Sequence, residues 1–303
     1  MRIGIMLPVA EDPDSDRRIT PYHELRQLAL AAEEGGLDSV WAADHLLYQA
    51  PDEPLIGFWE SWTLMTAIAE ATNRVEVGHL VLAVPFRNPM LLAWMANTLD
   101  EISDQRFVLG LGSGWNELEF KAGDFDFEHR VGVFEDSLNV ALPLLREGRV
   151  DYDGEFERAH AELRPPPRRA GGPPILIASK GPRMHRLAAT NADRWNTAWY
   201  GLPMEPFHER RDGLHAACRT ADRDPAEIDI TVGLSVIDES TLGEDDDRTR
   251  LLLAEPEVIA EGFRAWQAEG VAEVICRLHP STPDMVERLA RAADLMREDA
   301  GVQ

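Results

Sequence analysis

The chain has 303 residues, a length typical of one large α/β domain with a well-buried core. Its 54 acidic residues outnumber 30 basic ones, so the formal net charge is −24. This charge repels nucleic acid and anionic membranes, and neither is an expected partner. No segment offers the ~18 to 20 uninterrupted apolar residues of a membrane span, and the amino terminus has too short an apolar stretch for a signal peptide. We therefore expect a cytoplasmic protein.

Apolar runs of strand length alternate with longer segments of helical periodicity along nearly the whole chain. This alternation is typical of repeated strand–helix units around a parallel sheet. The expected strands are 3–9, 39–43, 75–83, 106–110, 174–178, 194–197, 228–237 and 273–278. The expected helices are 22–34, 61–71, one beginning near 88–89, 131–145, one beginning at 182, 205–220, 256–269 and 283–297. Eight units predict an α/β fold of the (β/α)8 TIM barrel type, with a doubly wound sheet as the alternative.

A short insertion follows the fourth unit. The segment VDYDGEFERAHAEL contains Asp153 and Gly154 between short polar-apolar stretches, a pattern typical of a β-hairpin. We find no segment with the composition of a linker, so residues 1–303 are expected to form a single domain. The two cysteines, Cys218 and Cys276, lack a metal-binding pattern, and we interpret them as reduced packing residues.

Polar groups at the carboxyl ends of the strands are the candidate site residues, because active sites of (β/α)8 barrels lie at that end. Strand two ends in Asp44 and His45. An imidazole can donate or accept a proton near neutral pH, and the preceding acid could fix its tautomer or an adjoining loop, so His45 is a candidate proton donor or acceptor. The alternative is a loop pair that hydrogen-bonds the backbone. His79 could complete a two-histidine metal site, but further ligands are missing and no metal is expected.

The strand-four end carries the glycine-rich stretch GLGSG at 110–114. Glycines there permit close approach of the backbone to a ligand, although they are more often a packing device. The spacing is not that of the GxGxxG dinucleotide fingerprint. Several tryptophans also fall at strand ends, and Trp115, Trp195 and Trp199 could line a flat apolar pocket for a planar ring.

The strand-five end leads directly into a helix through Ser179, Lys180, Gly181 and Pro182. Free amides and the positive end of a helix dipole form a natural site for an anion such as phosphate. Lys180 strengthens this interpretation, because it is one of only two lysines in the sequence. The alternative is an ordinary helix start with proline in the first turn. We favour the anion site.

Together these motifs resemble a known family. Asp44 and His45, then GHLVLAVPFRNP, RFVLGLGSGWNE, PILIASKGP and ADRWNTAW, are similar in order and spacing to the bacterial luciferase-like monooxygenase superfamily. The resemblance is strongest to the branch that uses the deazaflavin coenzyme F420, and it covers nearly the full chain. It implies a (β/α)8 barrel that binds a flavin or deazaflavin at its carboxyl-end mouth, usually as a homodimer.

The resemblance also implies roles for individual residues. A non-prolyl cis peptide in a bulge of strand three, matching Leu80-Val81, would support the cofactor ring. The ring edge would contact Asp44, Gly112, Ser113 and Asn116, and the phosphate of the tail would bind at the strand-five end. His45 matches a catalytic histidine of the sugar-phosphate dehydrogenases in this branch. The residues implied to bind the cofactor are Asp44, Leu80, Val81, Gly112, Ser113, Asn116, Ala178, Ser179, Lys180 and Gly181.

The resulting hypothesis is an F420-dependent oxidoreductase that exchanges a hydride between the cofactor's C5 and a small organic substrate. His45 would handle the proton, Trp115 and Trp199 would shape the substrate pocket, and a separate reductase or dehydrogenase would recycle the cofactor. The sugar-phosphate dehydrogenases carry a glutamate where this chain has Trp115, so glucose 6-phosphate is not the expected substrate. Two alternatives are an FMN-dependent two-component monooxygenase that uses O2 and a non-catalytic flavin-binding barrel.

Overall fold

The computed structural model describes residues 1–12, 18–51, 53–243 and 247–300. Within these residues, eight parallel strands close into a barrel in the order β1, β4, β7, β9, β12, β13, β14 and β16, with β16 pairing back to β1. Their bounds are β1 (Arg2–Met6), β4 (Ser39–Ala42), β7 (Glu76–His79), β9 (Phe107–Gly112), β12 (Ile175–Ala178), β13 (Arg194–Tyr200), β14 (Asp229–Ile237) and β16 (Glu273–His279). The predicted (β/α)8 barrel is confirmed.

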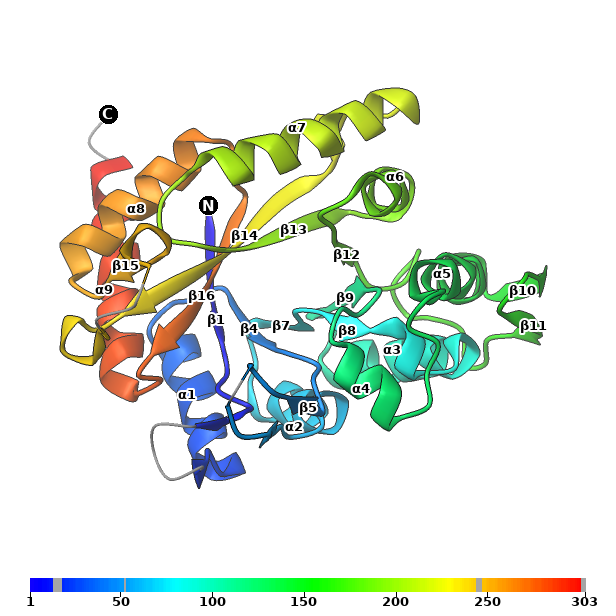
Figure 1. The fold of residues 1–303 in the computed structure, drawn as a ribbon, viewed down its shortest axis with the longest axis horizontal. Coiled ribbons are helices and arrows are strands. Elements are labelled where there is room, and N and C mark those ends of the chain that lie inside the picture. Colours follow the sequence, from blue (N-terminus) through cyan, green and yellow to red (C-terminus); the bar gives the residue numbers. More distant parts are fainter. Residues whose placement is uncertain (13–17, 52, 244–246, 301–303) are drawn as a thin grey trace.

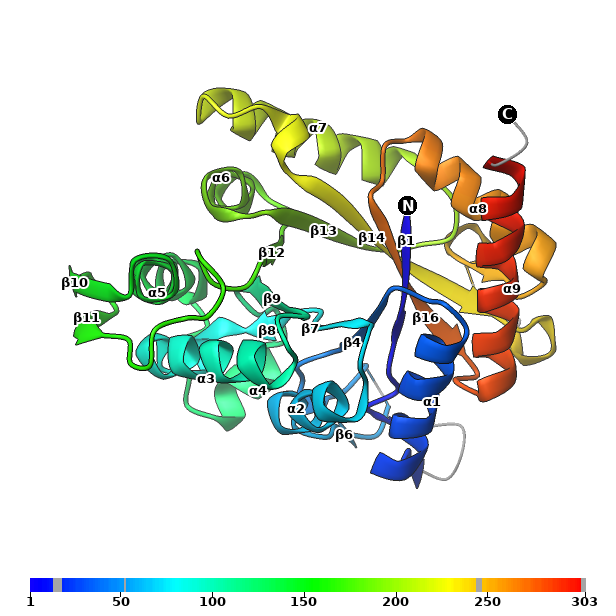
Figure 2. The same cartoon turned by 180° about the vertical axis from the view of Figure 1, so that it is seen from behind.

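Helices surround the barrel (Figure 1). The helices are α1 (Tyr22–Glu34), α2 (Ser61–Ala71), α3 (Pro89–Ile102), α4 (Glu117–Ala122), α5 (Arg130–Glu147), α6 (Pro182–Asn191), α7 (Glu205–Thr220), α8 (Pro256–Ala268) and α9 (Pro283–Ala300). The first and last of the outer helices, α1 and α9, lie side by side (Figure 2). Short 3-10 turns occupy Val84–Phe86, Pro225–Glu227, Glu239–Thr241 and Arg248–Arg250. Among the described residues, no helix combines the length and apolar character needed to cross a membrane.

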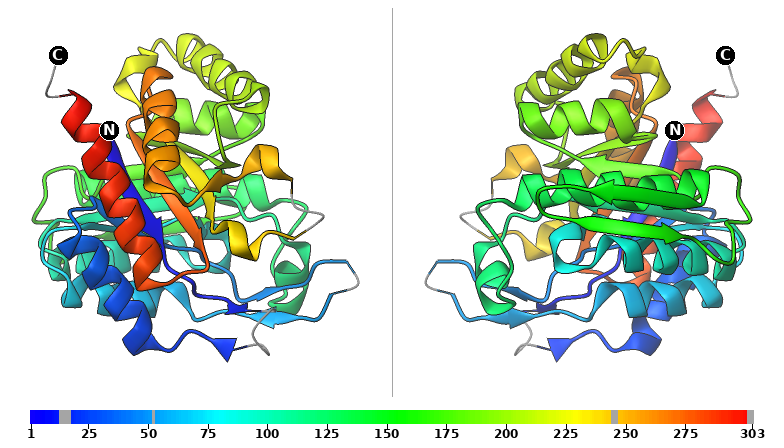
Figure 3. Two further views of the ribbon diagram at one scale, coloured as in Figure 1. Left: turned by 90° about the vertical axis from the view of Figure 1, so that its left-hand side faces the viewer. Right: turned by 90° about the vertical axis from the view of Figure 1, so that its right-hand side faces the viewer.

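The predicted hairpin is present as antiparallel strands β10 (Arg149–Asp153) and β11 (Arg158–Glu162). It lies beyond α5 on the outside of the barrel and faces the viewer in the right-hand panel of Figure 3. Among the described residues, the sequence did not predict five further short strands: β2 (Glu11–Asp12), β3 (Arg18–Ile19), β5 (Leu47–Tyr48), β6 (Ile56–Gly57) and β15 (Leu252–Leu253). The short strand β8 (Leu82–Ala83) falls within the expected strand 75–83. The β5–β6 hairpin lies between the expected strand 39–43 and the expected helix 61–71, and it was missed because two-residue strands carry no detectable periodicity.

Two hydrophobic clusters account for the stability of the barrel. The larger one lies between the sheet and the surrounding helices. It includes Cys218 and Cys276, which are both buried as free thiols. A smaller cluster fills the barrel with one residue from each of five strands: Met6, Trp41, Val108, Leu176 and Ile275. Leu80, Val81 and Trp199 pack against the smaller cluster and lie at its carboxyl-end side. The barrel interior is therefore a packed core whose upper layer forms the floor of the mouth.

Candidate active site

The third barrel strand is interrupted at the mouth. The structure divides it into β7 and β8, and the peptide bond Leu80-Val81 between them is cis, as the family resemblance implied. β9 pairs with both pieces, but Val77 pairs with Phe107 whereas Leu82 pairs with Leu111, so the third strand holds one extra residue. One extra residue on one side of a ladder defines a β-bulge. The sequence predicted one unbroken strand at 75–83, whereas the structure has two strands separated by the bulge.

The glycines of β9 make room for this bulge. A Cβ atom on Gly110 would lie 1.8 Å from the carbonyl oxygen of His79, and one on Gly112 would lie 2.6 Å from the side chain of Val81. No larger residue fits at either position without moving the backbone of the bulge. The packing role of this glycine-rich stretch is thus shown, and the cofactor contact of Gly112 remains a prediction.

Asp44 anchors the strand that follows the bulge. Its buried carboxylate forms a bidentate ion pair with Arg87, at 2.6 and 2.8 Å, and accepts a hydrogen bond from the amide of Ala83 at 2.9 Å. Paired hydrogen bonds of this kind hold both partners in one geometry. Asp44 therefore joins the end of β4 to β8. The interpretation that Asp44 fixes the tautomer of His45 is wrong, because its oxygens are directed at Arg87 and Ala83.

The partner of His45 is Glu119, a residue that the sequence reasoning missed. Nδ1 of His45 lies 2.9 Å from Oε2 of Glu119, and Oε1 of Glu119 accepts the amides of Leu46 and Leu47 at 2.5 and 3.2 Å. Burial raises the pKa of the Glu119 carboxyl, but the hydrogen bonds from His45 and the two amides outweigh it and the net pKa is lowered. A carboxylate at this position accepts a hydrogen bond from Nδ1–H, which leaves Nε2 of His45 as the second reactive nitrogen.

Helix α4 explains why Glu119 was missed. The segment 115–130 reads as a loop, yet Asn116 caps a short helix there by accepting the amide of Leu118 at 3.3 Å. The side-chain amide of Asn116 also donates to the carbonyl oxygen of Leu47 at 2.6 Å, so the helix is tied to the β5–β6 hairpin. Asn116 and Glu119 together fix α4 against the loop that bears His45. The only available signal was the capping residue followed by Glu119 three positions later.

Aromatic side chains surround His45. Its ring lies 5.3 Å from that of Phe58 and 5.5 Å from that of Trp115, and Tyr48 approaches Trp115 at 5.9 Å between ring centroids. Trp115 is 62% exposed, a large exposure for a tryptophan whose ring contacts both His45 and Tyr48. Together, these rings form one apolar wall beside the imidazole. Ser113, half-buried, lies two residues before this wall at the end of β9.

Ser179 at the end of β12 is buried, and its hydroxyl is fully engaged. It lies 2.7 Å from Nδ1 of His185 and accepts the indole N–H of Trp195 at 2.7 Å. Trp195 is completely buried, so our expectation that it lines the pocket is wrong. The periodicity could not distinguish Trp195 from Trp199, because both belong to one strand whose course changes at a second cis bond.

Lys180 and Gly181 lie where β12 passes into α6. Lys180 is exposed, and a Cβ atom placed on Gly181 would have no neighbour within 4 Å, so this helix start is open to solvent. The pKa of Lys180 is lowered by burial and by the positive charges of Arg210 and Arg250. Three cations thus share this region. Like charges held close together favour the binding of an anion.

Trp199 belongs to the floor of the mouth. The bond Ala198-Trp199 is a second non-prolyl cis peptide, and no sequence signal marked it. The ring lies so close to Gly233 that a Cβ atom there would be 2.8 Å from Trp199. The guanidinium of Arg277 lies 5.0 Å from the centroid of the Trp199 ring.

His79 does not share a metal site with His45. Its ring is fully buried and stacks on Trp62 at 5.0 Å, and burial lowers the pKa of His79 to about 4. In the described part of the chain, no three His, Cys, Asp or Glu side chains are grouped as metal ligands. His79 is a core residue beneath the bulge.

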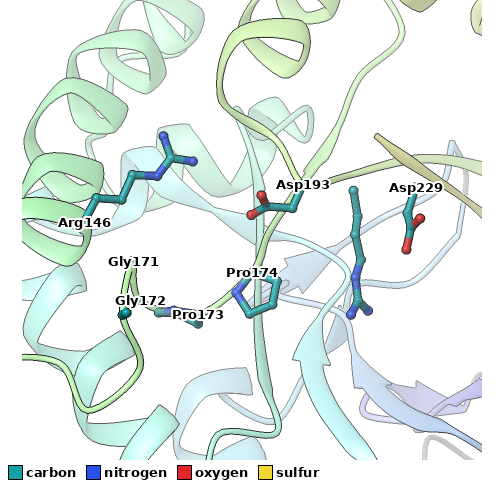
Figure 4. A pocket seen from close by; sticks show the side chains of 9 residues that line it. Arg146, Gly171, Gly172, Pro173, Pro174, Asp193 and Asp229 are labelled. Carbon is teal, nitrogen blue, oxygen red and sulfur yellow. The ribbon is translucent and has the colours of Figure 1, made fainter. Parts of the chain in front are cut away.

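A surface hollow of about 710 Å³ lies away from the mouth, at the amino ends of β12, β13 and β14 (Figure 4). Its charged side chains are engaged in structural contacts: Arg146 donates to Asn191, Asp193 accepts the amide of Ile175 and Asp229 pairs with Arg2. The amino-terminal face of such barrels serves stability rather than chemistry. The mouth therefore remains the candidate active site.

The fold and the mouth define a (β/α)8 barrel whose third strand carries a bulge with a cis peptide bond at the carboxyl end. Comparison with protein families is decisive, because the profile for luciferase-like monooxygenase matches residues 1–242. The chain belongs to the luciferase-like monooxygenase family.

Curated relatives include an F420-dependent glucose-6-phosphate dehydrogenase of Rhodococcus erythropolis, 32% identical over 220 residues that cover 70% of this chain and 64% of the relative. The Mycobacterium tuberculosis protein described by the same words is 32% identical over 223 residues, with coverage of 69% and 64%. The match thus spans less than two thirds of the length of these relatives.

Solved structures share the fold at low sequence identity. An F420-dependent secondary alcohol dehydrogenase in complex with an F420-acetone adduct has a TM-score of 0.79 at 16% identity, covering 97% of this chain and 98% of its own. A monooxygenase from Streptomyces bottropensis has a TM-score of 0.78 at 20% identity, with coverage of 98% and 99%. An EDTA monooxygenase from Chelativorans has a TM-score of 0.82 at 15% identity, with coverage of 99% and 94%.

Proposed function

We propose that this protein is an F420-dependent oxidoreductase that exchanges a hydride between C5 of the deazaflavin and a small organic substrate. The observation that carries the proposal is the pairing of His45 with Glu119 beside the bulge at Leu80-Val81. It places a hydrogen-bonded imidazole next to the apolar surface on which a planar ring would lie. The names of the curated relatives support F420 as the cofactor.

The residues of the mouth fit such a cofactor. Leu80, Val81 and Trp199 form an apolar floor for a flat ring, and the open start of α6 at Lys180 and Gly181 suits its anionic tail. Ala178 and Ser179 precede this helix start, and Gly112, Ser113 and Asn116 line the approach from β9. Ser179 would contribute its backbone, because its hydroxyl is engaged by His185 and Trp195. Asp44 would not contact the ring through a free oxygen. It would instead hold β8 in place beside the ring, through its bonds to Ala83 and Arg87.

His45 would hold or accept the proton that accompanies hydride exchange. When bound, the deazaflavin supplies the two-electron chemistry, and the protein supplies placement and proton handling. Glu119 accepts the hydrogen of Nδ1, so Nε2 is the atom that would meet a substrate hydroxyl or carbonyl. Trp115 and the rings around it would exclude water from that contact.

The substrate is proposed to differ from glucose 6-phosphate. Trp115 occupies the position of the glutamate acid in the sugar-phosphate dehydrogenases that the chain resembles. A large exposed indole presents an apolar surface where those enzymes present a proton donor. We expect a substrate with an apolar or aromatic part that packs on Trp115.

An FMN-dependent two-component monooxygenase is the second candidate. Two of the structural neighbours are described as monooxygenases, and their TM-scores of 0.78 and 0.82 are as high as that of the F420-dependent neighbour at 0.79. We further propose a cytoplasmic homodimer whose cofactor is recycled by a separate reductase or dehydrogenase. Sedimentation of the purified protein at several concentrations tests the dimer.

Titration with each cofactor separates the two candidates. The purified protein is titrated with F420 and, in parallel, with FMN, and quenching of cofactor fluorescence gives each Kd. We expect micromolar binding of F420. Tight binding of FMN without binding of F420 would replace the leading candidate with the monooxygenase. A His45→Ala variant that binds F420 normally and keeps full turnover would remove His45 from its proposed role.

A further inference from the structure

Arg277 lies on the inner side of the barrel at the mouth. Side chains of β16 alternate, so that Glu273 and Ile275 face the interior whereas Val274 and Cys276 face the outer helices. By this alternation Arg277 faces inward, one layer above Ile275. The register of β14 with β16 pairs Ser235 with Arg277, so both lie in the same layer near the carboxyl ends of the strands.

The contacts of Arg277 leave its charge uncompensated within the described residues. One NH2 group of the guanidinium donates a hydrogen bond to the hydroxyl of Ser235 at 3.1 Å. The central carbon of the guanidinium lies 5.0 Å from the centroid of the Trp199 ring. In the part of the chain that the structure describes, no carboxylate forms an ion pair with Arg277. Arg87 and Arg194, by contrast, each pair with carboxylates at 2.6 to 2.8 Å.

Some other arginines without an ion pair in the described residues use their N–H groups within the protein. Arg106 donates four hydrogen bonds and Arg210 donates three, whereas Arg277 donates only one among the described residues. Solvent reaches Arg277, yet burial lowers its pKa, which is the signature of a cation in a recessed mouth rather than on an open surface. The guanidinium lies over the Trp199 ring, and apart from the bond to Ser235 its N–H donors have no hydrogen-bond partner among the described residues.

We propose that Arg277 binds an anionic oxygen group, a carboxylate or a phosphate, of a molecule held in the mouth above Trp199. This inference rests on the proposed function for the identity of that molecule. The anionic group would belong either to the substrate or to the cofactor. A planar guanidinium with free N–H groups matches two oxygens of either anion.

Anion binding can be measured without turnover. The apo protein and the F420-loaded protein are titrated with sodium acetate and with inorganic phosphate, at an ionic strength held constant with sodium chloride. Tryptophan fluorescence and the Nε–H resonance of Arg277 report binding, and a Trp199→Phe variant identifies the fluorescent reporter. Arg277→Gln removes the charge, Arg277→Lys keeps it, and Arg26→Gln on the exposed side of α1 is the matched control.

We expect saturable binding in the wild type, at least tenfold weaker binding in Arg277→Gln, partial recovery in Arg277→Lys and no change in Arg26→Gln. Binding to the F420-loaded protein assigns the site to the substrate. Anions that compete with F420, together with a tenfold loss of F420 affinity in Arg277→Gln, assign it to the cofactor. An Arg277 resonance that does not move with either anion, or equal anion affinities of wild type and Arg277→Gln, overturns the proposal. Failure of the wild type to bind F420 refutes the proposed function alone, because the apo titration still tests Arg277.

Discussion

Replacing Glu119 with glutamine separates the role of its charge from that of its shape. In the structure one carboxylate oxygen accepts two backbone amides and the other faces Nδ1 of His45. The glutamine oxygen can still accept the amides, but its NH2 group then faces Nδ1 and can only donate to it. The proton of the neutral imidazole must move to Nε2. We therefore expect Glu119→Gln to invert the tautomer of His45.

The magnitude follows from the contacts of Glu119. Hydrogen bonds to a charged group contribute about 1.5 to 3 kcal/mol and neutral ones about 0.5 to 1.5, so the loss is about 1 kcal/mol for each of three bonds. The Glu119 side chain is only 2% exposed, so solvent screening does not reduce this value much. We expect the free energy of unfolding to fall by about 2 to 3 kcal/mol. If His45 is the proton carrier, kcat should fall by about 10²- to 10⁴-fold.

The stability loss should depend on pH. The pKa of Glu119 is lowered in the folded state, so its carboxylate stabilises the protein fully above the ordinary carboxyl pKa. This stabilisation is lost as the pH falls through the lowered pKa. The difference between wild type and Glu119→Gln should therefore be largest near neutral pH and should shrink below about pH 4.

Two measurements test this reasoning, with Glu117→Gln as the control. Glu117 lies on the same helix, but it is exposed and pairs only with Lys121, so its replacement should change stability by less than about 0.5 kcal/mol. Chemical denaturation gives the free energies, and long-range ¹H–¹⁵N spectra of the imidazole at pH 8.5 give the tautomer of His45. A Glu119→Gln protein with Nδ1 still protonated and with wild-type stability would refute the role assigned to Glu119.

Three further predictions concern the bulge and the core. Asp44→Asn should lower the free energy of unfolding by about 3 kcal/mol in chemical denaturation, because Arg87, largely shielded from solvent, would keep only the more exposed Glu60 at 3.3 Å as its counter-charge. An unchanged midpoint would contradict this. Gly110→Ala should lower the free energy of unfolding by about 3 kcal/mol or more in the same assay, because the new Cβ would lie 1.8 Å from the carbonyl oxygen of His79. Gly181→Ala is the control: its Cβ would have no neighbour within 4 Å, so stability should hardly change. Burial lowers the pKa of His79 to about 4, so the free energy of unfolding should decline by about 3 kcal/mol as the pH falls from 6.5 to 4. In pH-dependent denaturation, His79→Phe should not show this decline.

Periodicity predicted the barrel because each strand and each outer helix buries apolar residues at its own regular spacing. The ends of α1 and α2 match the expected ranges 22–34 and 61–71, and a helix start at 88–89 follows from the cap formed by Asn88 and the following proline. Strands of two residues, such as β5 and β6, could not be predicted in this way because they are too short to show a periodic pattern. The β5–β6 hairpin is tied to a distant segment of the chain, since Asn116 donates a hydrogen bond to the carbonyl oxygen of Leu47.

The site was predicted in part, and the errors share a cause. Local patterns placed His45 and Lys180 at the carboxyl ends of the strands, and the family resemblance placed the cis bond at Leu80-Val81, where the structure has it. The pairing of His45 with Glu119 spans 74 positions, and no local rule connects the two residues. Asp44, adjacent in sequence, seemed the better partner. A carboxylate can pair with whichever donor the fold brings to it, and here that donor is Arg87.

The distribution of charge at the mouth follows from these pairings rather than from composition. The whole chain is strongly acidic, yet both carboxylates described beside His45 are engaged, Asp44 by the guanidinium of Arg87 and Glu119 by hydrogen bonds from the imidazole and two amides. On the opposite strands, Lys180 shares its region with other cations, and Arg277 has no carboxylate partner among the described residues. Nearby charges in a low-dielectric mouth outweigh distant, screened ones. The proposed binding of an anionic group at the mouth is therefore compatible with the acidic net charge of the chain.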